Sequence, residues 1–165
     1  MKHCFMFLLG IFLSATLCGQ NYSSEVVFLQ QQGNTLTVRA LGISEKKKEA
    51  ANMALKSAFY TLFYTGVDGV NKGNPMVSTA KPDYDRRFFD ENRYSVFVKD
   101  YTVTEGPEKQ GKQYRCTVEM TILFDALQKD LNRNKVQTNL GMAVGTPNSQ
   151  GSLPTVTGGS YNREE

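Results

Sequence analysis

The stretch SEKKKEAANMALKSAFYTLFYTG, residues 44–66, decides the fold because it predicts one long helix. It contains no proline or glycine before Gly66, and Ser44 is a suitable N-cap residue. About 21 residues would give a helix about 32 Å long. At about 100° per residue, small and apolar side chains share one face, which holds Ala51, Ala54, Leu55, Ala58 and Leu62. We therefore expect this helix to lie close against a sheet.

The same helix carries large side chains that point away from its alanine face. They are Met53, Tyr60 and Tyr64, with Phe63 beside them. Either another segment covers these side chains or they form an exposed docking surface, and we expect the segment that follows to cover them. The remainder of the outer face is polar and is expected to stay in solvent, at Glu45, Glu49, Asn52 and Lys56.

The segment after the helix is GVDGVNKGNPMVSTAKPDYDRRFFDENR, residues 66–93, which is too long for an ordinary loop. Its paired aromatic residues, Phe88 and Phe89, are the expected anchors, and we expect them to form one cluster with Met53, Tyr60 and Tyr64. The glycines of this segment lack the spacing of a nucleotide-binding loop. No nucleotide or other cofactor is therefore expected.

Tyrosine and arginine side chains in these two segments are the candidates for contact with a partner. If the long segment covers the helix, then Tyr84, Arg86 and Arg87 should be exposed on it, and both residue types are enriched at binding hot spots. The candidate partner-binding residues are accordingly Tyr60, Tyr64, Tyr84, Arg86 and Arg87.

Four acidic residues in the long segment could suggest a metal site or an acid–base pair, namely Asp83, Asp85, Asp90 and Glu91. Three arginines lie among them and nearly balance their charge, at positions 86, 87 and 93. A self-neutralised surface helix is the preferred interpretation. We therefore expect no catalytic residue and no metal ligand here.

Strands are expected on both sides of these segments. EVVFLQQQGNTLTVRALG, residues 25–42, predicts two strands around a turn at Gly33 and Asn34, with Gly42 ending the second. YSVFVKDYTVTE (94–105) and QYRCTVEMTILF (113–124) predict a hairpin joined by the turn-rich GPEKQGK. Apolar residues alternate along its second strand, which places Cys116 in the core as an inert thiol.

A short helix with Asp125 as its N-cap follows, in ALQKDLNRN. The order β-β-α-β-β-α predicts an α+β fold with two layers, in which one long helix packs on an antiparallel or mixed sheet of about four strands. Residues 25–134 should form a single domain. Residues 135–165 should form a flexible tail, because 17 of these 31 residues are Gly, Pro, Ser, Thr or Asn.

The amino terminus, MKHCFMFLLGIFLSATLCG, has the layout of a secretory signal peptide over residues 1–19. Lipid attachment at Cys18 is the alternative, but Leu17 and Ala15 make a poor lipobox. We expect cleavage after Gly19 and export to the periplasm or the outer membrane. No second apolar run predicts a transmembrane helix in the mature chain.

The mature chain, residues 20–165, would carry 18 basic and 16 acidic residues, a net charge of about +2. No basic stripe of the kind that binds nucleic acid is present. Loss of His3 with the signal peptide removes the only histidine, which excludes Ser-His-Asp, Cys-His and histidine–zinc sites. The lysines at 46–48 could attract an anion such as a lipid phosphate, although a solvated basic turn is preferred.

The chain contains, in order, a strand, RALGISEKKKEAANMALKSAFYTLF, a long loop, YSVFVKDYTV, a turn and YRCTVEMTILFDALQKDL. This order resembles that of the bacterial LPP-twenty lipoprotein family. It also resembles the amino-terminal domain of the flagellar assembly protein T. The likeness covers roughly Leu36 to Leu131. It implies a two-layer domain, with a long helix on a curved sheet, and a non-enzymatic role at the bacterial outer membrane or in envelope assemblies.

We therefore expect a non-enzymatic binding or assembly module whose partner is an envelope protein or a second copy of the chain. The alternative is a carboxylate-dependent enzyme that acts on glycans. Such an enzyme would need two carboxylates facing one cleft, about 5 to 10 Å apart.

Overall fold

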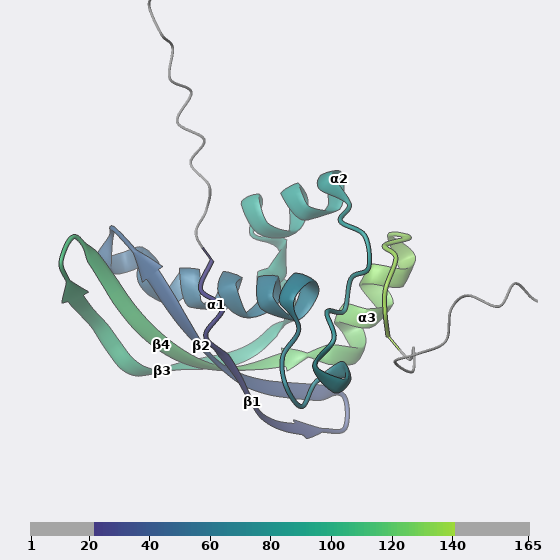
Figure 1. Ribbon diagram of the computed structural model, residues 1–165, viewed down its shortest axis with the longest axis horizontal. Coiled ribbons are helices and arrows are strands. Elements are labelled where there is room, and N and C mark those ends of the chain that lie inside the picture. Colours follow the sequence, from purple (N-terminus) through teal and green to yellow (C-terminus); the bar gives the residue numbers. More distant parts are fainter. Residues whose placement is uncertain (1–21, 141–165) are drawn as a thin grey trace, which may run out of the picture.

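Four antiparallel strands form one open sheet in the order β1-β2-β4-β3, and the helices pack on one of its faces (Figure 1). The computed structural model describes residues 22–140. The strands are β1 (Val26–Gln32), β2 (Thr35–Ser44), β3 (Val98–Gln110) and β4 (Gln113–Leu123). The predicted α+β class is confirmed. The signal peptide expected at 1–19 and the tail residues 141–165 lie outside the described residues.

The central helix is continuous but is not one uniform α-helix. It begins as a 3-10 turn, η1 (Lys47–Glu49), continues as α1 (Ala50–Tyr60) and ends as a π-helical turn, η2 (Thr61–Thr65). Ser44 is the last residue of β2 and not the N-cap, although its Oγ accepts a hydrogen bond from the Lys46 N–H at 3.1 Å. Gly66 ends the helix as predicted, with φ at 93°.

The helix lies so close to the sheet that β2 needs a glycine beneath it. Ala50, Ala54 and Ala58 are fully buried on the inner face of α1. A Cβ atom on Gly42 would lie 2.1 Å from the Ala50 carbonyl oxygen and 2.3 Å from the Ala54 nitrogen. The expectation that Gly42 ends the strand is therefore wrong, because β2 runs through Gly42 to Ser44 and the glycine permits the close approach.

Two positions on α1 differ from the expected helix faces. Ala51 is only half-buried, while Lys56, expected in solvent, is 9% exposed. The Lys56 ammonium lies 5.8 Å from the centre of the Tyr94 ring, so its aliphatic stem is buried and its charge is placed over an aromatic face. Tyr94 in turn donates a hydrogen bond to Asn52.

The second hairpin begins later and extends further than expected. Tyr94 lies in a 3-10 helix, η5 (Arg93–Phe97), which places Tyr94 and Phe97 on one side toward the core. β3 begins only at Val98 and continues through the expected turn to Gln110, so that the turn itself is Gly111 and Lys112. The expectation of a strand from Tyr94 is wrong because burial of Tyr94 and Phe97 selects a helical spacing.

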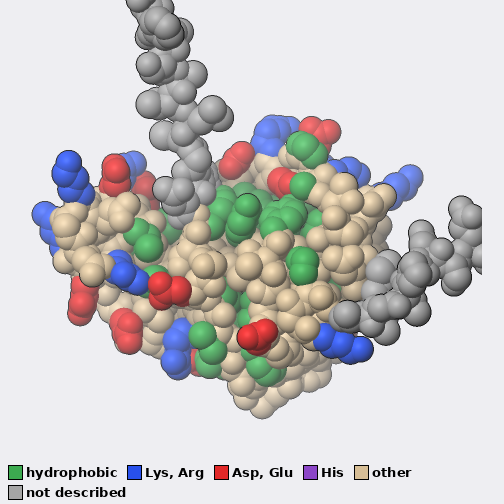
Figure 2. All heavy atoms as spheres, in the orientation of Figure 1, with side chains coloured by type: hydrophobic (Ala, Val, Ile, Leu, Met, Phe, Trp, Pro, Cys, Tyr) green, Lys and Arg blue, Asp and Glu red, His purple; other side chains and the backbone are tan. Residues whose placement is uncertain are grey.

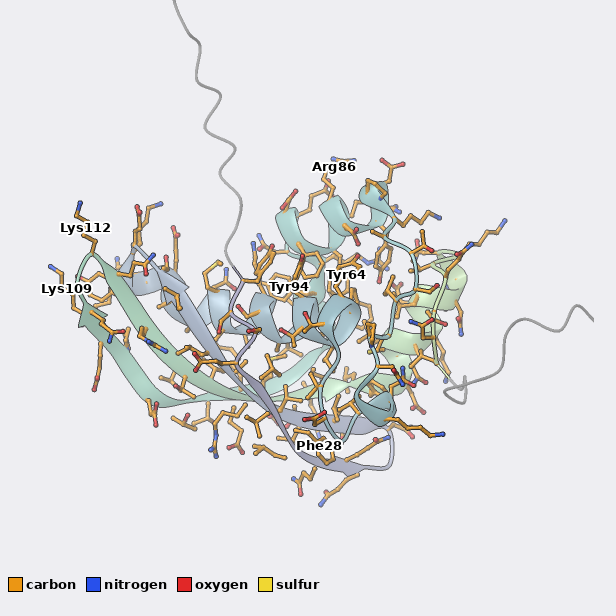
Figure 3. All side chains as sticks on the ribbon, in the orientation of Figure 1. Phe28, Tyr64, Arg86, Tyr94, Lys109 and Lys112 are labelled. Atoms are coloured by element: carbon orange, nitrogen blue, oxygen red, sulfur yellow. The ribbon has the colours of Figure 1, made fainter. Side chains whose placement is uncertain are left out.

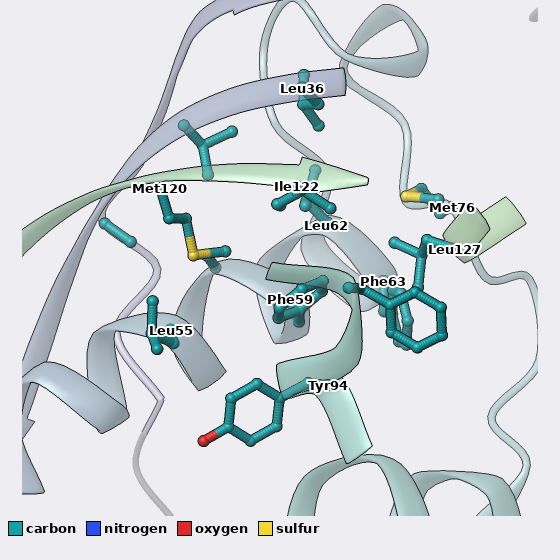
Figure 4. Close-up of a cluster of buried hydrophobic side chains, with 14 of the residues drawn as sticks. Leu36, Leu55, Phe59, Leu62, Phe63, Met76, Tyr94, Met120, Ile122 and Leu127 are labelled. Carbon is teal, nitrogen blue, oxygen red and sulfur yellow. The ribbon is translucent and has the colours of Figure 1, made fainter. Parts of the chain in front are cut away.

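The alternation predicted for β4 is confirmed. Cys116, Val118, Met120 and Ile122 are buried beneath α1, while the residues between them lie on the opposite face of the sheet, away from α1. Burial raises the pKa of the Cys116 thiol, which keeps it protonated and inert. Figure 4 shows Met120 and Ile122 directed toward Leu55, Phe59 and Leu62 of the central helix.

The remaining elements close the core beside α1. The long segment contains η3 (Asn71–Gly73), α2 (Pro82–Asp85) and a π-helical turn, η4 (Arg86–Asp90), and the last helix is α3 (Phe124–Arg133). Leu123 occupies the N-cap position of α3 and Asp125 lies in its first turn, so the expectation of Asp125 as the N-cap is wrong. Within residues 22–140, no helix combines the length and the apolar character that crossing a membrane requires.

The domain extends past its expected end at residue 134. Val136 is 6% exposed, Val77 pairs with Thr138, and the Asn139 N–H donates to the Met76 carbonyl at 2.8 Å. Residues 135–140 therefore pack against the long segment, and the expectation that a flexible tail starts at 135 is wrong for these six residues.

Candidate functional site

The candidate site is built on a continuous network of aromatic rings between α1–η2 and η4. Phe88 is fully buried and Phe89 is 5% exposed, as expected for the anchors of the long segment. Phe63 links them to the central helix, with ring centres 4.9 Å from Phe88 and 5.9 Å from Phe89. The long segment therefore packs onto the aromatic side of the central helix, as predicted.

Both helical segments that contribute these rings end in a π turn. The Gly66 N–H donates to the Thr61 carbonyl at 2.7 Å, and the Glu91 N–H donates to the Arg86 carbonyl at 3.2 Å. Each bond spans five residues and widens the helix locally, a feature that is common at functional sites. The widened turns carry Tyr64 and Phe89 and bring them to the rim of the network.

At the rim, three partly exposed tyrosines lie together with the buried ring of Phe89, and we call these four side chains the aromatic surface: Tyr22, Tyr60, Tyr64 and Phe89. Tyr22 stacks on Tyr60 with ring centres 4.6 Å apart and contacts Phe89 at 5.6 Å. Tyr60 lies 5.2 Å from Tyr64 and keeps 38% of its surface exposed. Figure 2 shows hydrophobic side chains gathered between α1 and α2, beside the point where the described chain begins.

The cluster predicted from the sequence is thus confirmed for four of its five members. Tyr60, Tyr64, Phe88 and Phe89 belong to one connected set of ring contacts. Met53 is half-buried and instead lines a shallow hollow that it shares with Ile43 and Tyr22. Met53 lies on the same side of the helix as Tyr60 but about two turns, or about 10 Å, earlier along its axis, so it lies too far along the helix to join the rings of the long segment.

Polar partners hold the aromatic surface in place. The Tyr64 hydroxyl donates to Asp85 Oδ1 at 2.5 Å, which ties η2 to α2. Burial and this hydrogen bond raise the pKa of the Tyr64 hydroxyl. Burial also raises the pKa of the Asp85 carboxyl, and this effect outweighs the lowering of that pKa by the hydrogen bond. Burial, and after it the charge of Asp90, raises the pKa of the Tyr22 hydroxyl to about 12. These tyrosines stay neutral at physiological pH.

Tyr84 does not belong to the site, which corrects the sequence-based assignment. It was expected on the surface but is 2% exposed, and its hydroxyl donates to Asp130 Oδ2 at 2.9 Å. Arg93 pairs with the other oxygen of Asp130 at 2.5 Å, so the buried carboxylate is satisfied. Tyr84 is therefore structural, since it joins α2 to α3.

The two arginine candidates flank the aromatic surface but differ in exposure. Arg86 is exposed and makes a surface ion pair with Glu91 at 2.9 Å, and Figure 3 shows its side chain directed away from the domain. Arg87 is half-buried and its Nε donates to the Asp83 carbonyl at 3.1 Å. Arg86 can reach a partner, whereas Arg87 mainly stabilises its own helix.

Tyr22 is the site residue that the sequence did not reveal. The Ser23 N–H donates to Ser57 Oγ at 3.0 Å, and Thr61 Oγ1 donates to the Ser23 carbonyl at 3.3 Å. These hydrogen bonds hold the residues before β1 against α1, so that the Tyr22 ring stacks on the Tyr60 ring. No local pattern announces contacts between segments that are more than 30 residues apart.

A second hollow lies on the opposite face of the sheet, and we call it the sheet groove. It encloses about 540 Å³, and its charged lining consists of Glu25, Arg39, Glu105, Glu108, Lys109 and Arg115. Arg115 lies 3.5 Å from Glu25, and Thr117 donates to Glu105 at 2.8 Å. The groove is polar, and both signs of charge line it.

Two of the four acidic residues of the long segment are ion-pair or hydrogen-bond partners. Asp85 accepts from Tyr64, and Glu91 pairs with Arg86. Among residues 22–140, no three His, Cys, Asp or Glu side chains lie together so that they could hold a metal ion.

No family model, curated protein or solved structure matches the chain. The resemblance to the LPP-twenty family and to the flagellar domain stays a prediction from the sequence.

Proposed function

We propose that this protein is a non-enzymatic module of the bacterial envelope that binds a partner protein through the aromatic surface. The signal-like amino terminus supports export to the periplasm or the outer membrane, and the family resemblance supports the envelope. Cleavage after Gly19 remains the preferred processing, with a lipid on Cys18 as the alternative.

One observation carries the proposal: Tyr60 is 38% exposed although it belongs to a ring network that runs into the core. A ring held by stacked neighbours loses little side-chain entropy on binding, which is why tyrosine is common at binding hot spots. Tyr22 and Tyr64 support Tyr60 on two sides. The surface is thus pre-organised for contact.

The chemistry of this surface favours a protein partner with an apolar side chain at its centre. The rings offer flat apolar area, while Asp85, Asp90 and Arg86 at its border can accept or donate hydrogen bonds. An apolar centre with a polar rim is the usual arrangement of a protein interface. We therefore expect an exported protein to place an aliphatic or aromatic side chain against Tyr60.

The test compares two substitutions on opposite faces of the domain. Tyr60→Ser removes the exposed ring, and Val27→Ser removes an apolar side chain that is 57% exposed on the open face of the sheet. Tagged wild-type and variant proteins are purified from the envelope after mild chemical cross-linking. We expect one exported protein to be recovered with wild type and Val27→Ser but lost with Tyr60→Ser. Equal recovery with Tyr60→Ser would refute the assignment.

A second candidate function is favoured by the sheet groove. Three carboxylates line this one groove, those of Glu25, Glu105 and Glu108, and a glycan-acting enzyme requires a pair of carboxylates across a cleft. Release of reducing ends from purified peptidoglycan tests this candidate. Activity in the wild type that disappears in Glu105→Gln would support the enzyme, and no release by the wild type would remove it.

A further inference from the structure

The outer strand β3 has a free edge with apolar side chains beside it. Among residues 22–140, β3 pairs only with β4, and it lies at one end of the sheet order. Five large apolar side chains are exposed in the described part of the chain, and two of them, Tyr101 and Val103, lie two residues apart on β3. An open strand edge with apolar neighbours is a template for pairing with another strand.

The hydrogen bonds of the sheet show which backbone groups face the neighbouring strands. The Leu41 N–H donates to the Glu25 carbonyl at 3.1 Å, so the backbone groups of Leu41 face β1. Successive residues in an antiparallel ladder alternate between their two neighbours. Ala40 therefore faces β4, and Val118, its partner in the register, faces back to β2.

The same alternation identifies the groups at the free edge of β3. Glu119 follows Val118 and faces β3, where it is paired with Thr102. Thr102 therefore directs its backbone groups to β4. Tyr101 and Val103, on either side of it, direct their N–H and C=O groups outward. Residues 101–103 therefore combine outward-facing backbone hydrogen-bonding groups with the exposed side chains of Tyr101 and Val103.

This stretch is complementary to itself. When two copies of β3 pair antiparallel about a twofold axis at Thr102, Tyr101 lies opposite Val103 of the second copy, twice. Aromatic residues opposite β-branched residues stabilise cross-strand pairs. Centring the axis on Val103 instead would leave each Tyr101 opposite the irregular part of the second strand, beyond Val103.

We propose that β3 is a self-association edge and that its occupant is a second copy of this chain, paired antiparallel about Thr102. Register shifts between Val98 and Asp100 and between Val103 and Glu105 bound the regular stretch. These irregularities and Pro107 blunt the rest of the edge. The regular contact is therefore short, and the dimer forms reversibly as the protein concentration rises. It does not involve the aromatic surface.

The test uses single cysteines in the purified exported protein. Thr102→Cys places two cysteines opposite each other at a non-hydrogen-bonded pair, where Cα atoms are about 4.5 Å apart and a disulfide is possible. The control, Thr104→Cys, places its two cysteines four residues apart along the paired strands, about 13 Å, which is too far for a disulfide. Cys116 is buried in both variants.

We expect mild oxidation to give a disulfide-linked dimer with Thr102→Cys and none with Thr104→Cys. A monomer with Thr102→Cys, or equal dimer with both variants, would overturn the proposal. In sedimentation equilibrium, Val103→Pro should weaken association about tenfold, because its lost N–H faces the free edge and two hydrogen bonds per dimer disappear. Tyr60→Ser should leave the dimer unchanged, which separates this interface from the proposed partner site.

Discussion

Replacing Gly42 with alanine tests the close contact between β2 and the central helix. The added Cβ would lie 2.1 Å from the Ala50 carbonyl oxygen, 2.3 Å from the Ala54 nitrogen and 2.8 Å from the Ala54 Cα. All three atoms belong to the helix backbone and cannot rotate away. The helix must retreat by at least 0.9 Å, the difference between 2.1 Å and 3.0 Å, to relieve the shortest contact.

Overpacking a core usually costs about 1 to 3 kcal/mol of stability. A clash with backbone atoms belongs at the upper end of this range. We therefore expect Gly42→Ala to lower the free energy of unfolding by about 3 kcal/mol or more. Gly106→Ala is the matched control, because it lies in β3 and its Cβ would meet nothing within 4 Å. It should change stability by less than about 0.5 kcal/mol. Urea unfolding followed by circular dichroism measures both variants. A loss below about 1 kcal/mol for Gly42→Ala would refute the close contact.

Three further predictions address the core, the aromatic surface and the processing of the chain. Met120→Ala should destabilise the protein by about 2 to 5 kcal/mol in urea while Glu119→Ala has little effect, because only Met120 is buried; equal effects would contradict the β4 register. The pKa of the Tyr22 hydroxyl should be about 12. The stability that the neutral hydroxyl contributes to the folded state is therefore fully present below the ordinary pKa near 10 and is lost as the pH rises through 12. Ultraviolet titration of wild type and Tyr22→Phe checks this pKa. Metabolic labelling with a tagged fatty acid should leave the protein unlabelled, and a label that disappears in Cys18→Ala would contradict cleavage after Gly19.

The sequence was sufficient to predict the fold where burial leaves a local pattern. β4 has one face under α1 and one face in solvent, so its alternation is visible in the residues themselves. Residues 94–98 show the limit of this reasoning. Tyr94, Val96 and Val98 alternate as in a strand, yet Val96 is 62% exposed and the buried pair is Tyr94 with Phe97, at a helical spacing. Only the tertiary packing selects between the two patterns.

The candidate site was predicted in part, for the same physical reason. Tyr60 and Phe89 could be brought together because large apolar side chains beside a long segment need cover. Tyr84 was misplaced because its burial depends on Asp130, which lies 46 residues away. Tyr22 was missed because residues before β1 reach α1 through contacts with Ser57 and Thr61 that no local pattern encodes.

The most direct test of the central claim, that the aromatic surface binds an envelope protein, is site-specific photo-crosslinking in living cells. A photoreactive phenylalanine analogue is placed at Tyr60 and, as the control, at Val27 on the open face of the sheet. We expect light to produce one discrete adduct from position 60, containing an exported protein identified by mass spectrometry, and none from position 27. The absence of an adduct at position 60, or the same adduct from both positions, would contradict the claim.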